Sequence, residues 1–270
     1  LVITSMATAS NVLHGWKWGM IMPENRTAMT RRRLIEALSG ESINRFDRKP
    51  EEFEEWKQYT RDNFKIISNK RHWSILEVIE MGKRLVEVYG IKALLIDPYN
   101  FFKVTGNGYS FNNEILSQLR VFAETYCSVY LMAHPSSEAP RKRIDQLGYL
   151  AKPQKYDIQG GADFPYRVDN FFTIHRIVNH EDKNTRKIVQ FCVEKIKETE
   201  TGGMVHNQGE WTELAWDIRE GFMGYYDDDG NNPMRQSLLA KRNVNELNEN
   251  VKVDPLKPLT TEDAFGDFEF

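Results

Sequence analysis

Residues 91–98 read IKALLIDP, and this stretch decides the fold. Its apolar run has the length of one strand, and an unbroken apolar run is typical of a strand covered on both faces. Strands of that kind belong to parallel sheets with helices on either side. The run ends on Asp97, so a carboxylate follows the strand directly.

The same alternation repeats on both sides of this strand. WKWGMIM (16–22) and CSVYLMAH (127–134) are two further apolar runs of strand length. Helical spacing of apolar residues separates the runs, in residues 1–15, 27–40, 74–89 and 112–126. Alternating strands and helices predict an α/β fold with an open, mostly parallel, twisted sheet flanked by helices.

The rest of the chain departs from this alternation. Residues 41–73 are charged and aromatic, and we expect a small helical insertion there. VDNFFTIHR (168–176) and KIVQFCVEKIK (187–197) read as strands, and two shorter runs between 213 and 226 read as a final antiparallel pair at the C-terminal edge. From Asp227 the composition becomes acidic. We therefore expect one domain over 1–226 and an acidic, flexible tail over 227–270.

Composition narrows the class of protein. The net charge is −3, so nucleic-acid binding must come from local basic patches. Hydrophobic residues make up 40% of the 270 residues, and no apolar run approaches the roughly 18 residues of a membrane span. Cys127 and Cys192 lie in apolar runs, which favours core thiols in a reducing compartment. We expect a cytoplasmic protein without a membrane partner.

Polar side chains follow three of the predicted strands. Asp97 suits a Mg²⁺ site opposite a nucleotide phosphate, and Glu24 suits the activation of an attacking water. His134 can contact a γ-phosphate from the same edge, because the carboxyl ends of parallel strands meet there. Each residue also has a plainer interpretation: a turn-capping aspartate, a glutamate at a helix N-terminus and a structural histidine.

Two further segments carry basic residues. The stretch 135–166 interleaves tyrosines and glycines with cations, which suits a single-stranded nucleic acid, although a solvated charge run has the same composition. Its candidate DNA-binding residues are Arg141, Lys142, Arg143, Lys152, Lys155, Gly160 and Gly161. Lys195 and Lys197 alternate along one strand, so both project from one face, either toward a phosphate or as protection of a sheet edge.

These segments, in this order, resemble the RecA-type motor of DnaB-family replicative DNA helicases, especially the phage primase-helicases and their mitochondrial relative Twinkle. The resemblance covers residues 1–226. It is carried by HGWKWGMIMPENR, ALLIDPYN, LMAHP, KYDIQGGADFPYRVDNFFTIHR and EKIKETETGG. It implies a RecA-like P-loop NTPase core and an ATP- and Mg²⁺-dependent DNA helicase. It also implies a hexameric ring on single-stranded DNA, in a bacterium or a phage-infected host cell.

The resemblance also implies roles for matching residues. Glu24 matches the catalytic glutamate that orients the attacking water, Asp97 the Walker B aspartate that holds Mg²⁺ through water, and His134 the γ-phosphate sensor. Arg176 matches an arginine near the nucleotide. Lys195 and Lys197 match a basic pair inserted at a neighbouring subunit's γ-phosphate. The second member is usually arginine, and lysine lacks its bidentate fork. The loop 135–164 matches the DNA-contacting loop.

The phosphate loop is the largest departure from the family. No G-x-x-x-x-G-K-[ST] occurs in the 270 residues. Residues 1–14 match the helix that follows this loop, so we expect the loop before Leu1 and expect this chain by itself to bind ATP poorly.

Two questions stay open at this point. The acidic, aromatic tail 261–270 suits docking on a polymerase or another replisome protein, and a solubilising tail is the alternative. For the whole chain, the alternatives to a helicase are a recombinase, a packaging motor, or a non-catalytic RecA-like DNA-binding or assembly scaffold.

Overall fold

The protein is described by a computed structural model that covers residues 2–102, 108–136, 148–158, 163–207 and 209–232. Two four-stranded sheets form its framework. The first is parallel, in the order β2 (Phe64–Ile66), β1 (Trp18–Ile21), β3 (Ala93–Ile96) and β4 (Ser128–Leu131). The second is antiparallel, in the order β5 (Asn170–His175), β6 (Ile188–Ile196), β7 (Thr212–Arg219) and β8 (Phe222–Tyr226).

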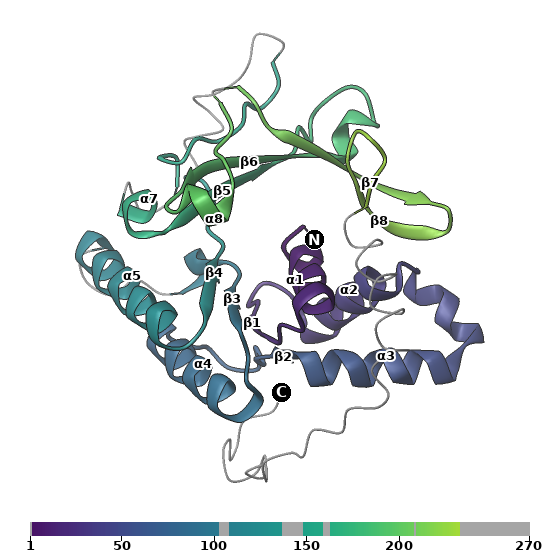
Figure 1. The fold of residues 1–270 in the computed structure, drawn as a ribbon, viewed down its shortest axis with the longest axis horizontal. Helices are drawn as coiled ribbons and strands as arrows, with labels where there is room; N and C mark the ends of the chain where they lie inside the picture. The colour runs from purple at the N-terminus through teal and green to yellow at the C-terminus, as the bar shows by residue number, and fades with distance from the viewer. Residues whose placement is uncertain (1, 103–107, 137–147, 159–162, 208, 233–270) are drawn as a thin grey trace.

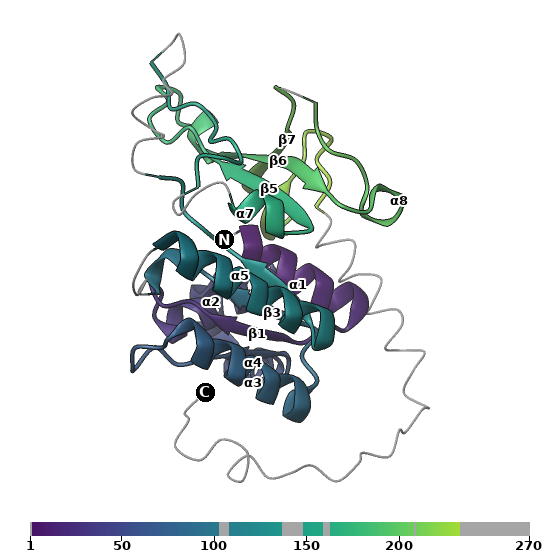
Figure 2. The same ribbon diagram turned by 90° about the vertical axis from the view of Figure 1, so that its left-hand side faces the viewer.

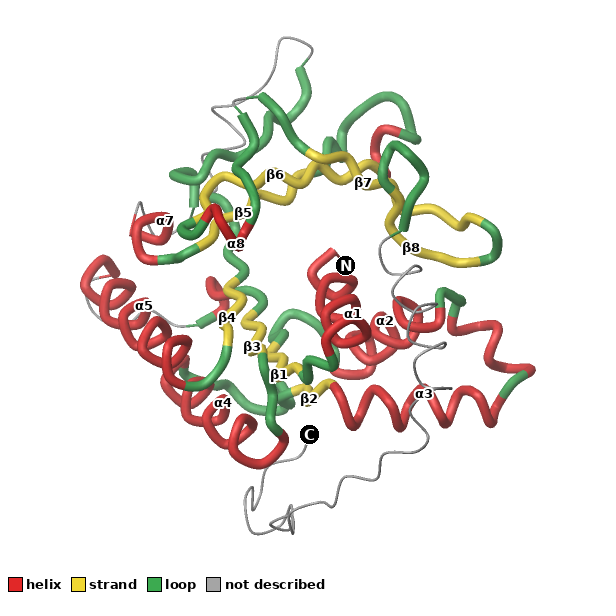
Figure 3. The backbone as a smooth tube through the Cα atoms, in the orientation of Figure 1, coloured by secondary structure: helices red, strands yellow, loops and turns green. Residues whose placement is uncertain are grey.

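Helices cover both faces of the parallel sheet (Figures 1 and 3). One face carries α1 (Val2–His14), α2 (Thr27–Ser39) and α3 (Pro50–Asn63), and the other carries α4 (Ile75–Tyr89) and α5 (Gly108–Thr125). Figure 2 shows the antiparallel sheet as a separate layer beyond the parallel one. The short helices are η1 (Ile43–Arg48), η2 (Tyr99–Phe101), α7 (Asp163–Arg167), η3 (Thr185–Lys187) and α8 (Thr199–Gly202). The predicted α/β architecture is confirmed.

Strand β3 has a core on each side because its side chains alternate between the two faces. Leu94 and Ile96 pack with α4 and α5, whereas Ala93 and Leu95 pack with α1 and α2. All four side chains are fully buried. The apolar run 93–96 is therefore unbroken because β3 is covered on both faces, as the sequence predicted.

Local signals set the ends and the packing of helix α4. Ser74 and Glu77 form a capping box at its start, and Gly90 ends it in a left-handed conformation with φ 66°. Gly82 lies where the helix meets β3 and α5. A Cβ at this position would lie 2.9 Å from side-chain atoms of both Leu94 and Phe122, so only glycine allows this close approach.

The segment 41–73 differs in part from the predicted helical insertion. Helices η1 and α3 do form there, but Phe64–Ile66 forms β2 and pairs in parallel with β1 (Trp18↔Phe64). A three-residue strand is too short to give a readable period, and charged residues surround it. This part of the chain therefore belongs to the sheet itself.

The start of the predicted tail folds back on the domain. The Asp227 amide donates to the Asn231 carbonyl oxygen over 3.0 Å, and Asn232 is buried against Gly224. The docking segment 261–270 lies outside the described residues. Within the described part of the chain, no helix is both long and apolar enough to cross a membrane.

Candidate functional site

The three polar residues predicted at strand ends lie together at the carboxyl edge of the parallel sheet. Asp97 directly follows β3, and its backbone N–H donates to the Ile21 carbonyl oxygen of β1 over 3.0 Å. Glu24 and His134 each lie three residues beyond their strands, β1 and β4. The His134 Nε2 atom is 3.6 Å from the Glu24 Oε1 atom. Three chain segments thus converge on one polar site, as parallel topology requires.

Asp97 occupies an unfavourable environment for a carboxylate. Burial raises the pKa of its carboxyl above the usual range, and the negative charge of Glu24 adds to the increase. The charges of His134 and Arg33 oppose this shift. A cation bound next to Asp97 would restore the ionised form, which suits the carboxyl to a metal-binding role.

Asn69 holds the turn that carries Glu24. Its side-chain amide donates to the Asn25 carbonyl oxygen at 2.5 Å and lies 3.3 Å and 3.4 Å from the carbonyl oxygens of Met22 and Pro23. Arg33 of α2 donates to the Asn25 side chain from the other side over 3.2 Å. The backbone of the turn is therefore fixed, while the Glu24 side chain stays half-exposed to water.

The loops after β3 and β4 are tied to each other in the same way. The Asn100 side chain accepts a hydrogen bond from the His134 amide over 2.7 Å, and the Tyr99 amide donates to the Met132 carbonyl oxygen over 2.7 Å. Asp97 and His134 are therefore held at a fixed separation along the sheet edge.

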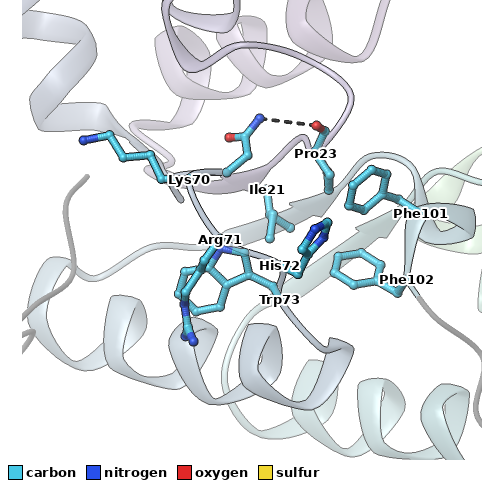
Figure 4. Close-up of a pocket in the computed structure, with 9 residues that line it drawn as sticks. Ile21, Pro23, Lys70, Arg71, His72, Trp73, Phe101 and Phe102 are labelled. Carbon is cyan, nitrogen blue, oxygen red and sulfur yellow. Dashed lines mark hydrogen bonds between the residues drawn. The ribbon is translucent and has the colours of Figure 1, made fainter.

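A small hollow lies beside the Glu24 turn (Figure 4). Ring systems and apolar groups form much of its wall, and the side chains of Lys70 and Arg71 point away from it. Arg71 stacks on the Trp73 ring at 3.8 Å and pairs with Glu77 at 3.1 Å. The lining residues are Ile21, Pro23, Asn69, Lys70, Arg71, His72, Trp73, Phe101 and Phe102. The hollow therefore adds little charge to the neighbouring polar site.

The predicted DNA-binding loop is described only in part. Arg141, Lys142, Arg143, Gly160 and Gly161 lie outside the described residues. The Lys152 ammonium group lies 3.2 Å from Glu194 and 3.1 Å from the Cys192 sulfur, so it faces the second sheet rather than solvent. Lys155 differs, because its ammonium group lies 5.2 Å from the Tyr156 ring.

The basic pair at the end of β6, Lys195 within it and Lys197 just after it, divides into two environments. Lys195 is half-buried and donates to the carbonyl oxygens of Pro165 (2.8 Å) and Val168 (2.7 Å), so it holds the end of α7. Lys197 is half-exposed and pairs with Asp169 at 3.2 Å. The alternation of side chains along a strand could not predict this difference, because the difference depends on how α7 packs against the strand. Arg176, just after β5, donates to the Arg186 carbonyl oxygen.

Sequence reasoning missed Asn69, Asn100 and Glu194. Each forms hydrogen bonds with groups more than 30 residues away along the chain. Asn69 lies in the stretch interpreted as an insertion. The one available signal was its position just after the short apolar run FKII (64–67).

Comparisons with known proteins give one sequence relative and several similar folds. The chain is 30% identical over 218 residues to the Twinkle homolog protein, chloroplastic/mitochondrial, of Arabidopsis thaliana. This match covers 74% of the chain and 29% of the relative, so the chain spans less than a third of the relative's length. No protein-family model matches.

Two solved structures share the fold. One is the ATPase domain of G40P, with a TM-score of 0.59 and 16% identity, covering 82% of this chain and 79% of that one. The other is a structure of a DnaB-like replicative helicase and its interactions with primase. Its TM-score is 0.57 at 17% identity, and the match covers 82% of this chain and 54% of that one. These two structures show a RecA-like fold, and together with the sequence relative they support a RecA-type domain of the DnaB helicase family.

Proposed function

We propose that this chain is the ATP-hydrolysing motor domain of a replicative DNA helicase, which moves along single-stranded DNA and unwinds duplex DNA. The observation that carries the proposal is the meeting of Glu24, Asp97 and His134 at one sheet edge. The similarity to the Twinkle homolog protein, and the likeness of the fold to an ATPase domain and to a DnaB-like replicative helicase, support the same activity.

The residues at this edge fit a nucleotide with Mg²⁺. Within the described part of the chain, no group of three or more His, Cys, Asp or Glu side chains could hold a metal. Mg²⁺ commonly keeps several waters and takes one or two carboxylates together with phosphate oxygens, so the single carboxylate of Asp97 fits. When bound, Mg²⁺ neutralises charge on the transferred phosphate.

Glu24 and His134 divide the remaining chemistry. The half-exposed Glu24 carboxylate orients a water molecule and accepts its proton. His134 contacts the γ-phosphate. Its backbone bond to Asn100 links that contact to the loop after β3, and its own loop continues into the predicted DNA-binding segment. Loss of the γ-phosphate is thereby communicated to the DNA.

The proposal places the nucleotide at the boundary between subunits of a homo-oligomeric, hexameric ring. Lys195 and Lys197 are the basic pair directed at the γ-phosphate of the neighbouring subunit, and Arg176 lies near the nucleotide. Lys195 also holds the end of α7. Single-stranded DNA contacts the loop 135–164 in the central channel. The tail 261–270 docks on a polymerase or another replisome protein.

Glu24→Gln tests the proposal in the chain extended through the phosphate loop expected before Leu1. We expect DNA-stimulated ATP hydrolysis to fall about 100- to 10,000-fold, because general-base catalysis is lost while nucleotide binding remains. Glu55→Gln, at an exposed position on α3, is the matched control and keeps the wild-type rate. Wild-type hydrolysis by Glu24→Gln would overturn the assignment. Strand separation on a forked duplex distinguishes a helicase from a recombinase or a packaging motor.

A further inference from the structure

Two tyrosines, one within the predicted DNA-binding loop 135–164 and one just after it, leave much of their surface in water. Tyr156 is 49% exposed and Tyr166 is 71% exposed. Their ring centroids lie 6.3 Å apart at an interplanar angle of 43°. Aromatic side chains gain free energy from burial, so two adjacent exposed rings offer surface that a planar ligand can cover.

The backbone that carries both rings is anchored to the rest of the domain. On the Tyr156 side, Pro135 and Ile158 form an antiparallel bridge, and the Ser136 amide donates to the Asp157 carbonyl oxygen over 2.6 Å. On the Tyr166 side, Phe164 is buried against Tyr99, with ring centroids 5.3 Å apart. The pair is thus held near the end of β4, the strand that leads to His134.

A cation accompanies the pair. The Lys155 ammonium group lies 5.2 Å from the Tyr156 ring. Planar rings next to a positive charge match a nucleotide unit, which has a flat base and an anionic phosphate. A base in a duplex is already stacked on its neighbours, so the match favours an unpaired base.

We propose that Tyr156 and Tyr166 form a stacking site for unpaired bases of single-stranded DNA, and that Lys155 binds an adjacent phosphate. The inference rests on the proposed function and assigns base contact to two particular tyrosines at this loop. Because every base has a flat face, such contact holds the strand without selecting a sequence.

Two oligonucleotides of equal length and charge test this site. One carries thymine on every sugar, and the other carries abasic tetrahydrofuran units. Affinity for the full chain is measured by fluorescence anisotropy. We expect Tyr156→Ala and Tyr166→Ala each to weaken binding of the thymine strand about 5- to 150-fold, the equivalent of about 1–3 kcal/mol per stacked base. Binding of the abasic strand stays unchanged.

Three control variants separate stacking from other causes. Tyr166→Phe keeps the ring and retains wild-type affinity. Tyr126→Ala, directly after α5 and also exposed, changes neither affinity. Lys155→Gln weakens both strands alike and reduces the salt slope by about 0.7, the value for one phosphate contact on a single strand.

The outcomes separate this inference from the proposed function. Equal losses on both strands, or wild-type affinity of both alanine variants for the thymine strand, would overturn the stacking site and leave the motor proposal standing. Failure of the wild-type protein to bind either strand would overturn the DNA motor itself. Thermal unfolding of each variant checks that these exposed substitutions leave the fold intact.

Discussion

Replacing Glu194 with alanine should release residues 148–158 of the predicted DNA-binding loop. The Glu194 Oε1 atom accepts from the Lys152 ammonium group (3.2 Å) and the Thr173 hydroxyl (2.5 Å), and Oε2 accepts from the Lys155 amide (2.9 Å). One carboxylate on β6 thus holds β5 and the segment 148–158 together. The side chains of Glu194 and Lys152 are only 12% and 20% exposed.

These contacts set the size of the effect. Removing one member of a buried ion pair costs about 3–5 kcal/mol, and the partial exposure of this pair places Glu194→Ala at about 2–4 kcal/mol. Glu194→Gln keeps the shape but loses the charge, so we expect a cost of about 1.5–3 kcal/mol, the value of one hydrogen bond to a charged group. Adding Lys152→Met should restore part of this loss, because no unpaired charge then remains buried.

Urea denaturation followed by tryptophan fluorescence measures the global free energy of unfolding, and hydrogen exchange of the Lys155 amide measures local opening. Both measurements should show a lower stability in Glu194→Ala. If residues 148–158 open without global unfolding, the exchange rate of the Lys155 amide should change more than the free energy of unfolding does. Glu198→Gln, at an exposed position shortly after β6, controls for a general loss of negative charge. Unchanged exchange at Lys155 in Glu194→Ala would refute the anchoring role.

Three further predictions follow from the site and the core. Asp97→Asn should unfold at higher urea than wild type at neutral pH, because the raised pKa of Asp97 means that its ionised form disfavours folding. The difference should vanish in acid, where both folded and unfolded carboxyls are protonated, and a constant difference across pH would contradict this origin. Asn69→Ala should lower the kcat for ATP hydrolysis by the extended chain with little change in KM, because it frees the turn that carries Glu24. A stopped assay over a series of ATP concentrations measures both constants. Asn69→Asp, which cannot donate to the carbonyl oxygens of the turn, should not rescue the rate. Gly82→Val should cost about 1–3 kcal/mol of unfolding free energy through overpacking against Leu94 and Phe122, measured by urea denaturation, and wild-type stability would show that α4 can move away from the sheet.

The parallel core and the convergence of the polar site could be predicted from the sequence. Continuous apolar runs identify β1, β3 and β4, and parallel strands bring their carboxyl ends to one edge, so Glu24, Asp97 and His134 follow from topology. Strand β2 could not be predicted, because three residues give no period.

The positions of the supporting residues depend on tertiary contacts. Asn69 and Glu194 act on segments more than 35 residues away in the sequence, and no local pattern encodes such a bond. The contacts of Lys195 could not be predicted either. The strand pattern shows on which face of the sheet Lys195 lies, but not that the carbonyl oxygens of Pro165 and Val168 lie there.

The link between the loops after β3 and β4 has a consequence for protein engineering. The bonds from the Tyr99 amide to Met132 and from the His134 amide to Asn100 fix the number of residues between each strand and its polar side chain. A single residue inserted between Asp97 and Asn100, or between Leu131 and His134, would break this match and separate Asp97 from His134. An added loop or tag at this edge of the sheet should therefore be placed outside residues 97–100 and 131–134.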